Sequence, residues 1–182
     1  MATSTMKKTS DLCDACSEIA VCKTPLRSFG QIRSFYGEIK TVQCDGDITK
    51  MREAVNLPGR GMVLVVDNAG ILDHAVFGDV MAGLAIQNAW AGLIIYGAIR
   101  DVAIIDALPI GVKALGAIPC RGSRLGIGKA NIPVSFGGVS FSPGCFVVAD
   151  EDGVILLPAG MTPESISTEE AIRETYSFAA QK

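Results

Sequence analysis

The chain has 182 residues, 49% hydrophobic and 19% charged, with a formal net charge of -3 at pH 7. This length and balance suit one compact domain with a sizeable core. Its 16 basic residues form no cluster and are outnumbered by 19 acidic ones, which argues against a nucleic-acid partner. No run approaches the roughly 20 apolar residues of a membrane-spanning helix.

At its start the chain is expected to carry a disordered leader over residues 1–8, which lacks the apolar segment of a secretory signal. A first helix is predicted from Thr9 or Ser10, either of which can cap it, to about Val21. Pro25 prevents that helix from continuing.

Six cysteines raise the question of a zinc site or disulfides. Cys13 and Cys16 have C-x-x-C spacing with Cys22 close by, but the only histidine, His74, is distant and no second C-x-x-C exists. Free buried thiols on an amphipathic helix explain the spacing better. Such thiols are typical of a reducing cytosol, so we expect a cytoplasmic protein.

Strands are predicted at residues 37–44 and 62–66, with a short helix at 48–55 between them. Asp67 and Asn68 follow the second strand in a composition typical of a turn. They could also line a pocket at the strand end, and both interpretations stay open.

The central stretch from Gly78 to Asp101 organises the chain. Apolar spacing predicts a helix from Gly78 to about Asn88 with Asp79 as its N-cap. The apolar run Leu93–Tyr96 predicts a strand buried on both faces, which Gly97 would turn sharply toward Arg100 and Asp101. A helix N-terminus and a strand C-terminus can therefore meet.

This meeting point has the chemistry of an anion site. Free N–H groups of Asp79, Val80 and Met81 would attract a carboxylate, which Arg100 could grip in two places. Asp101 beside a bound anion makes sense mainly if a divalent metal lies between them. The simpler alternative is a surface ion pair between Arg100 and Asp101 contributing about 0–1 kcal/mol.

The second half is predicted to be rich in strands, with one or two helical turns at 102–108 before a strand at 110–117. Residues 121–129 carry three positive charges among glycines and indicate an exposed loop, because they lack the pattern of a phosphate loop. Residues 150–153 indicate a hairpin turn rather than a calcium loop. Further short strands are predicted at 134–136, 139–141, 146–148 and 154–157, and a C-terminal helix within 161–182.

Asp79, twenty intervening residues and Arg100-Asp101 match the D-x20-R-D signature of class II pyruvate aldolases. Those enzymes cleave 4-hydroxy-4-methyl-2-oxoglutarate and 4-carboxy-4-hydroxy-2-oxoadipate, and they share a fold with the regulator of ribonuclease activity A (RraA). The chain resembles this RraA-like family over about residues 9–160. Further segments that resemble it, in family order, are Asp11–Ala15, Leu64–Asp67, Ile95–Gly97, Ile110–Val112, Gly126–Gly128, Phe136–Val139 and Ala149–Ile155.

The resemblance implies an α/β fold, a layered β/β/α domain of the swivelling type with mixed sheets, flanking helices and trimeric assembly. It implies that Arg100 grips the carboxylate of a small 2-oxo acid beside the backbone of Gly78 to Met81. Asp101 would ligate Mg²⁺ or Mn²⁺, and Asp79 would orient water on that ion as the base. Cleavage would release pyruvate, and the same site would decarboxylate oxaloacetate.

Two alternatives accompany the resemblance. Some relatives are non-catalytic regulators that bind the endonuclease RNase E, but they depart from the Arg-Asp pair that this chain keeps at Arg100 and Asp101. A demethylmenaquinone methyltransferase would need a G-x-G nucleotide loop after an early strand, which this chain lacks. Aldolases of the family also use a neighbouring subunit's C-terminal glutamate, which is not placed among Glu164, Glu169, Glu170 and Glu174.

Overall fold

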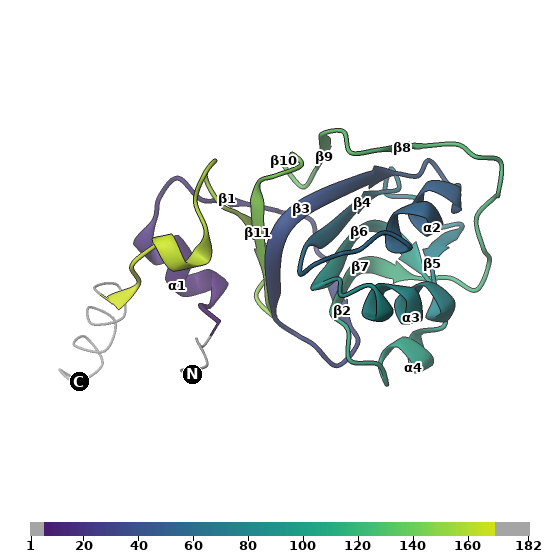
Figure 1. Cartoon of the computed structure of the whole chain (residues 1–182), viewed down its shortest axis with the longest axis horizontal. Coiled ribbons are helices and arrows are strands. Elements are labelled where there is room, and N and C mark those ends of the chain that lie inside the picture. The colour runs from purple at the N-terminus through teal and green to yellow at the C-terminus, as the bar shows by residue number, and fades with distance from the viewer. Residues whose placement is uncertain (1–5, 170–182) are drawn as a thin grey trace.

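The computed structural model describes residues 6–169 (Figure 1). In chain order its elements are α1 (Thr9–Ala15), β1 (Ala20–Val21), β2 (Arg27–Phe29), β3 (Phe35–Gln43), α2 (Thr49–Val55), β4 (Val63–Asp67), β5 (Ala75–Phe77), α3 (Asp79–Gln87), β6 (Gly92–Ile99), α4 (Val102–Ile105), β7 (Val112–Ala117), β8 (Lys129–Ala130), β9 (Val134–Phe136), β10 (Val139–Phe141), β11 (Phe146–Ala149), β12 (Val154–Leu156) and the 3₁₀ turn η1 (Pro163–Ser165).

One curled mixed sheet dominates the molecule. Its centre is the parallel set β3, β4, β6 and β7, in that order. Antiparallel strands extend both edges, with β11, β12 and β1 beside β3 and β2 beside β7. Because parallel strands share a direction, the ends of β4 and β6 lie at the same edge of the sheet, where α3 begins.

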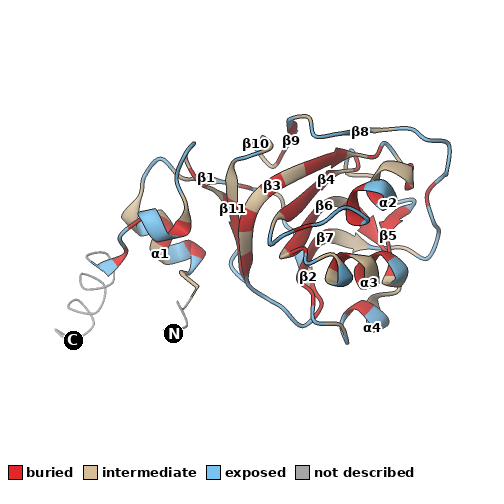
Figure 2. Ribbon diagram, viewed as in Figure 1, coloured by how far each residue is buried: buried red, intermediate tan, exposed pale blue. Residues whose placement is uncertain are grey.

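The central strands are buried on both faces, as apolar parallel strands require. On β4, Leu64 and Val66 pack with α2 and α3, whereas Val63 and Val65 pack with the β9–β10 hairpin. Figure 1 shows α2, α3 and α4 on one side of the central strands and α1 at the opposite end of the molecule, beyond β11, and Figure 2 colours much of the central strands as buried. The predicted layered α/β fold is confirmed.

The N-terminal helix is shorter than predicted, because α1 ends at Ala15 and the chain is extended from Cys16. Residues Ala20 and Val21, predicted to be helical, instead pair with β12. Thr9 is the first helical residue rather than the cap, and its side chain bonds to Asp150. All six cysteines are free.

The ends of the chain were predicted to be a leader and a helix. Residues 1–5 of the leader and 170–182 of the C-terminal helix lie outside the described residues. Lys7, within the expected leader, donates a hydrogen bond to the carbonyl of Pro163 at 3.0 Å. None of the helices within 6–169 has the length and apolar character needed to span a bilayer.

Gly97 does not turn the chain, contrary to the prediction, because β6 continues through it to Ile99. A Cβ at Gly97 would lie 2.7 Å from the Cβ of Asn68, so glycine is needed there for close packing. The sequence also gave no indication of β5, the strand that leads into α3.

Candidate active site

The strand β5 brings the two halves of the predicted site together. Ala75 and Phe77 pair in parallel with Ala98 and Ile99 at the far end of β6. The backbone N–H of Arg100 then donates to the carbonyl of Phe77 at 2.9 Å. The residue after Phe77, which starts the turn into α3, is therefore held against the end of β6.

Gly78 lies at the closest point of this contact. A Cβ there would lie 2.6 Å from Oδ2 of Asp101 and 3.2 Å from Nε of Arg100. Any side chain would push the Arg100 and Asp101 side chains away from the start of α3. The structure therefore brings Gly78, Arg100 and Asp101 together, as the sequence predicted.

Asp101 is held in an uncommon conformation. Its φ of 59° places it in the left-handed region, where a non-glycine residue is strained. Its Oδ2 lies 3.2 Å from Nε of Arg100, and the two side chains are 31% and 36% exposed respectively. The expected ion pair thus exists, but it is built on a strained backbone next to a helix N-terminus, which a surface ion pair does not require.

The first amides of α3 are arranged differently from the prediction. Gly78, not Asp79, occupies the N-cap position, and Asp79 is the first helical residue. The Asp79 carboxylate accepts a hydrogen bond from the Val80 N–H at 2.7 Å, and the Asp79 N–H points to Oδ2 of Asp101 at 3.4 Å. Of the three predicted anion-binding amides, only that of Met81 makes no hydrogen bond within residues 6–169.

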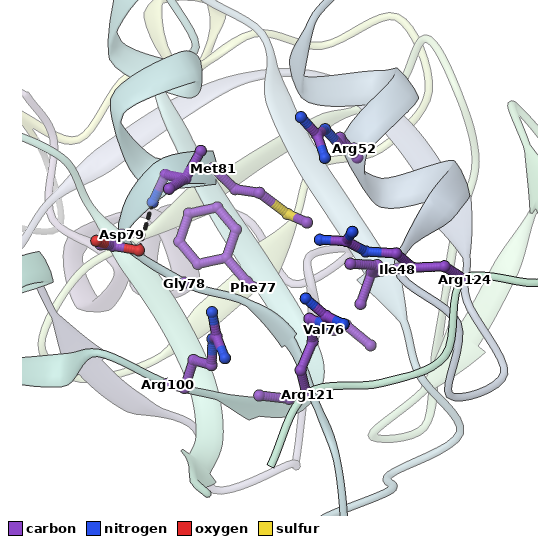
Figure 3. Close-up of a pocket in the computed structure, with 12 residues that line it drawn as sticks. Ile48, Arg52, Val76, Phe77, Gly78, Asp79, Met81, Arg100, Arg121 and Arg124 are labelled. Atoms are coloured by element: carbon purple, nitrogen blue, oxygen red, sulfur yellow. Dashed lines mark hydrogen bonds between the residues drawn. The ribbon is translucent and has the colours of Figure 1, made fainter. Parts of the chain in front are cut away.

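A cavity of about 250 Å³ opens in front of α3 (Figure 3). The predicted residues Gly78, Asp79, Val80, Met81 and Arg100 all line it. Asp101 does not, and it lines a neighbouring hollow with Arg100, Ala117, Ile118 and Pro119. Arg100 therefore forms the wall between the cavity and the Asp101 carboxylate.

Sequence reasoning missed the opposite wall of the cavity, which is formed by Ile48, Arg52, Arg121 and Arg124. The predicted exposed loop at 121–129 is indeed mostly exposed, yet two of its three cations face the cavity. The only available signal was the choice of arginine, rather than lysine, at two of the three charged positions, which is weak by itself.

Asp67 and Asn68 do not join the cavity. Asp67 pairs with Tyr96 across the sheet, so the cavity lies beyond the end of β4. Asp67 accepts a hydrogen bond from Ala69, and Asn68 accepts one from Gly46, both at 2.8 Å. The turn interpretation of these residues is therefore the correct one.

Asp47 holds in place the cavity wall that the sequence did not predict. Its carboxylate is buried and accepts hydrogen bonds from the Thr49 N–H at 2.8 Å, the Ser123 hydroxyl at 2.6 Å and the Leu125 N–H. Burial alone would raise the pKa of Asp47, but these hydrogen bonds outweigh it and hold the pKa well below 3.8. The ionised carboxylate thus ties the loop to the start of α2.

The donor set near Gly78 suits a hard, oxygen-loving cation. Asp79 and Asp101 are the carboxylates at this point, and residues 6–169 contain no cluster of three or more metal-ligating side chains. Mg²⁺ commonly binds through one or two carboxylates and completes its shell with water and substrate. The residues present therefore fit such an ion.

The curled sheet, the start of α3 packed against an Arg-Asp pair and the adjoining cavity are the features by which the class of this protein is recognised. The RraA-like family model, described as Aldolase/RraA, matches residues 9–156, and the chain belongs to this family.

Named relatives support this placement. A Xanthomonas campestris protein with the provisional name 4-hydroxy-4-methyl-2-oxoglutarate aldolase is 45% identical over 88% of this chain and 97% of its own. The RNA-processing inhibitor RraA from Thermus thermophilus is 35% identical over 86% of this chain and 98% of its own, with a TM-score of 0.82. A Geobacillus kaustophilus protein titled S-adenosylmethionine: 2-dimethylmenaquinone methyltransferase is 44% identical over 82% of this chain and 94% of its own, with a TM-score of 0.79.

Proposed function

We propose that this protein is a class II pyruvate aldolase that cleaves 2-oxo acids of the 4-hydroxy-4-methyl-2-oxoglutarate type. The observation that carries the proposal is the convergence of Asp79, Arg100 and Asp101 around Gly78, with Asp79 and Arg100 lining the cavity and Asp101 in the neighbouring hollow behind Arg100. The names of the relatives at about 45% identity point to the same reaction. Decarboxylation of oxaloacetate follows as a side activity, because it passes through the same enolate.

Arg100 is the proposed anchor for the substrate. It lines the cavity and offers planar donors to the C1 carboxylate, while Met81, whose N–H makes no hydrogen bond within residues 6–169, lines the same cavity at the start of α3. Its ion pair with Asp101 leaves other N–H donors of the guanidinium free for that carboxylate. Arg100 also stabilises the negative charge that grows on the 2-oxo oxygen as the carbon–carbon bond breaks.

Asp79 is proposed to orient the water that acts as the general base. Its carboxylate lies at the cavity wall, where it orients the water that accepts the proton of the 4-hydroxyl group. As that proton leaves, the oxygen forms a carbonyl with C4 and the C3–C4 bond breaks. The electron pair of that bond forms the enolate of pyruvate, which then takes a proton at C3.

Asp101 is the proposed ligand of a divalent cation, Mg²⁺ or Mn²⁺, with Asp79 nearby to hold its water. Such an ion, when bound, supplies Lewis-acid polarisation of the 2-oxo group. The position of Asp101 supports this assignment, because its carboxylate lies against Gly78 and the N–H of Asp79 at the start of α3. We further propose the trimeric assembly that the family resemblance implies.

The first experiment measures pyruvate release from 4-hydroxy-4-methyl-2-oxoglutarate and from oxaloacetate, with Mg²⁺, with Mn²⁺ and with a chelator. Release should depend on metal, and Arg100→Lys, which keeps the charge but loses the planar fork, should lower kcat/KM about 100-fold. Arg60→Lys is the control, because Arg60 is exposed and lies outside the cavity. Absence of pyruvate above the metal-only background would reject the aldolase and favour a non-catalytic, protein-binding regulator, since the Thermus relative is named an RNA-processing inhibitor.

A further inference from the structure

The donors proposed to hold the substrate carboxylate are already bonded to carboxylates of the chain itself. Oδ2 of Asp101 lies 3.2 Å from Nε of Arg100 and accepts the Asp79 N–H at 3.4 Å. The next amide, the Val80 N–H, donates to the Asp79 carboxylate at 2.7 Å. Within residues 6–169, the Met81 N–H and the other guanidinium N–H groups of Arg100 are the donors left for an incoming anion.

Asp101 takes the place of a side-chain cap at the start of α3. The N-cap residue is Gly78, which has no side chain to accept the first amides of the helix. A Cβ at Gly78 would lie 2.6 Å from Oδ2 of Asp101, so this glycine lets the carboxylate reach the helix from the end of β6. The partial positive charge of the helix N-terminus and the guanidinium of Arg100 both stabilise the carboxylate there.

These contacts hold part of Arg100 away from the cavity. Asp101 lines the hollow behind Arg100, whereas the cavity lies on the other side of that residue. Figure 3 shows Arg100 beside Gly78 and Asp79 at the cavity. Because the Nε–H of Arg100 is directed to Asp101, the edge of the guanidinium that contains Nε cannot bind a second carboxylate in two places.

A substrate carboxylate must therefore compete with Asp101. Both are anions, and both use the Nε–H of Arg100 and the first amide of α3. Two carboxylates that share the same donors also repel each other, more strongly in a partly buried site than in water. A simple carboxylate has no group that offsets this repulsion, so it should bind weakly while Asp101 keeps these contacts.

We infer that Asp101 is an internal competitor that keeps carboxylates out of the site until a divalent cation is bound. This inference rests on the proposed function, in which Asp101 ligates that cation. An Asp101 carboxylate that ligates a cation releases the Nε–H of Arg100 and the Asp79 N–H, and both donors become available to the substrate. The coupling is reciprocal, so the substrate carboxylate also strengthens cation binding. Asp101 thereby determines which state of the protein binds substrate.

The test measures carboxylate binding to the full chain without metal. Metal is removed on a chelating resin, because a dissolved chelator is itself a polycarboxylate. Titration with pyruvate and with propionate, followed by the broadening of their methyl proton signals, gives a Kd for each. Asp101→Gly should lower both Kd values about 10- to 100-fold, because a charge-assisted competitor is lost. Glycine suits the left-handed backbone at this position, so the variant should keep the melting temperature of the wild type.

Three further variants separate release of Arg100 from a general change in charge. Asp101→Asn keeps an acceptor oxygen but loses the charge, so its gain in affinity should be smaller. Asp45→Gly is the matched control, because Asp45 is exposed, has a φ of 51° and lines neither the cavity nor the hollow behind Arg100. Its Kd values should change less than about twofold. The double variant Arg100→Gln/Asp101→Gly should lose the gain, because the released donor is absent.

A second titration tests the coupling to the cation. Added Mg²⁺ should lower the pyruvate Kd of the wild type. It should leave the pyruvate Kd of Asp101→Gly unchanged, because that variant lacks the proposed ligand. A wild-type Kd that does not respond to Mg²⁺ would overturn the coupling.

The outcomes also separate this inference from the proposed aldolase. An unchanged metal-free Kd in Asp101→Gly, or a gain that persists in the double variant, would overturn the internal competition. Pyruvate release by the wild type would in that case still support the aldolase. A lower metal-free Kd in Asp101→Gly, with no pyruvate release by the wild type, would support the competition and reject the aldolase.

Discussion

Two regions of the molecule contain clusters of charged groups that differ in burial and in hydrogen bonding. Near the β11–β12 turn, the buried Asp150 carboxylate accepts both the N–H and the hydroxyl of Thr9 at 2.7 Å, and its backbone carbonyl accepts a hydrogen bond from Lys113. At and beside the cavity, Asp101 is half-buried, and Arg52, Arg121 and Arg124 are exposed and make no ion pair within residues 6–169.

The difference separates polar groups that hold the fold from those available for a ligand. A buried charge whose hydrogen bonds are all made within the protein has little capacity left for another partner. Charges that keep free donors and acceptors at a cavity instead lower the stability of the protein until a ligand satisfies them. Mutations should therefore affect stability at the Asp150 region and activity at the cavity.

The largest effect is expected at Asp101. Asp101→Asn removes the negative charge while keeping a residue that tolerates the left-handed backbone, so activity should fall about 1,000-fold or more. The melting temperature should stay near that of wild type. Steady-state pyruvate assays measure the activity and thermal unfolding measures the melting temperature, with Asp73→Asn at an exposed position as the control. Full activity in Asp101→Asn would remove Asp101 from the site.

Asp150→Ala should lower the stability of the protein and leave its activity nearly unchanged. Thr9 loses both of its hydrogen-bond acceptors, so the free energy of unfolding should fall by about 2–4 kcal/mol while kcat/KM stays within about twofold. Urea unfolding and pyruvate assays measure these quantities, with the exposed neighbour Glu151→Ala as control. A loss of activity without a loss of stability would contradict the division between the two regions.

The variant Asp47→Asn tests both kinds of charged group at once. Asp47 is a buried carboxylate with its hydrogen bonds made within the protein, like Asp150, but it holds the loop that lines the cavity. The low pKa of Asp47 means that the unfolded chain binds more protons, so its stabilisation is present above about pH 4 and is lost as the pH falls. The variant should be less stable by about 1–3 kcal/mol at neutral pH, and this difference should shrink in acid.

The KM of this variant for 4-hydroxy-4-methyl-2-oxoglutarate should also rise, since the loop that carries Arg121 and Arg124 into the cavity wall loses its attachment to Asp47. Urea unfolding from about pH 3 to 7 and steady-state kinetics measure the two effects. Asp45→Asn is the matched control, because Asp45 is exposed and its φ of 51° suits asparagine. A stability difference that does not change with pH would contradict the assigned role of the ionised carboxylate.

The smallest effect is expected at Lys113. Burial lowers the pKa of Lys113 from 10.5, and nearby carboxylates, led by Asp150, offset only part of this. The unfolded chain then binds more protons just below pH 10.5, so Lys113 makes wild-type stability rise with pH there. Lys113→Met should lack this rise, as urea unfolding at about pH 8 and 10 would measure. Parallel curves would contradict the buried-charge interpretation.

Local patterns predicted the central strands and α3 well, because their apolar periodicity is long and unbroken. They also predicted that Asp79 and Arg100 lie close together, since the N-terminus of the helix after one parallel strand and the C-terminus of the next parallel strand lie at the same edge of the sheet. They did not predict β5, because three residues are too few to show an apolar periodicity. They also predicted a turn at Gly97, where glycine is instead required by close packing against Asn68.

The second wall of the cavity could not be predicted for a different reason. Arg52 and Arg124 are far apart in the sequence, and the segments that carry them are joined by hydrogen bonds, among them those to Asp47, which have no sequence pattern. The same applies to Thr9, whose partner Asp150 is 141 positions away. Contacts of this range form only when the sheet is folded, so they are visible only in three dimensions.

The left-handed backbone at Asp101 also constrains how this protein can change over generations. Aspartate codons become asparagine or glycine codons by a single base change, and both residues tolerate this conformation better than other amino acids do. Either change would remove the charge without disturbing the surrounding strands. With Asp101 in its proposed role, a gene of this kind can therefore lose its chemistry in one mutational step while its product persists as an intact protein, free to acquire another role.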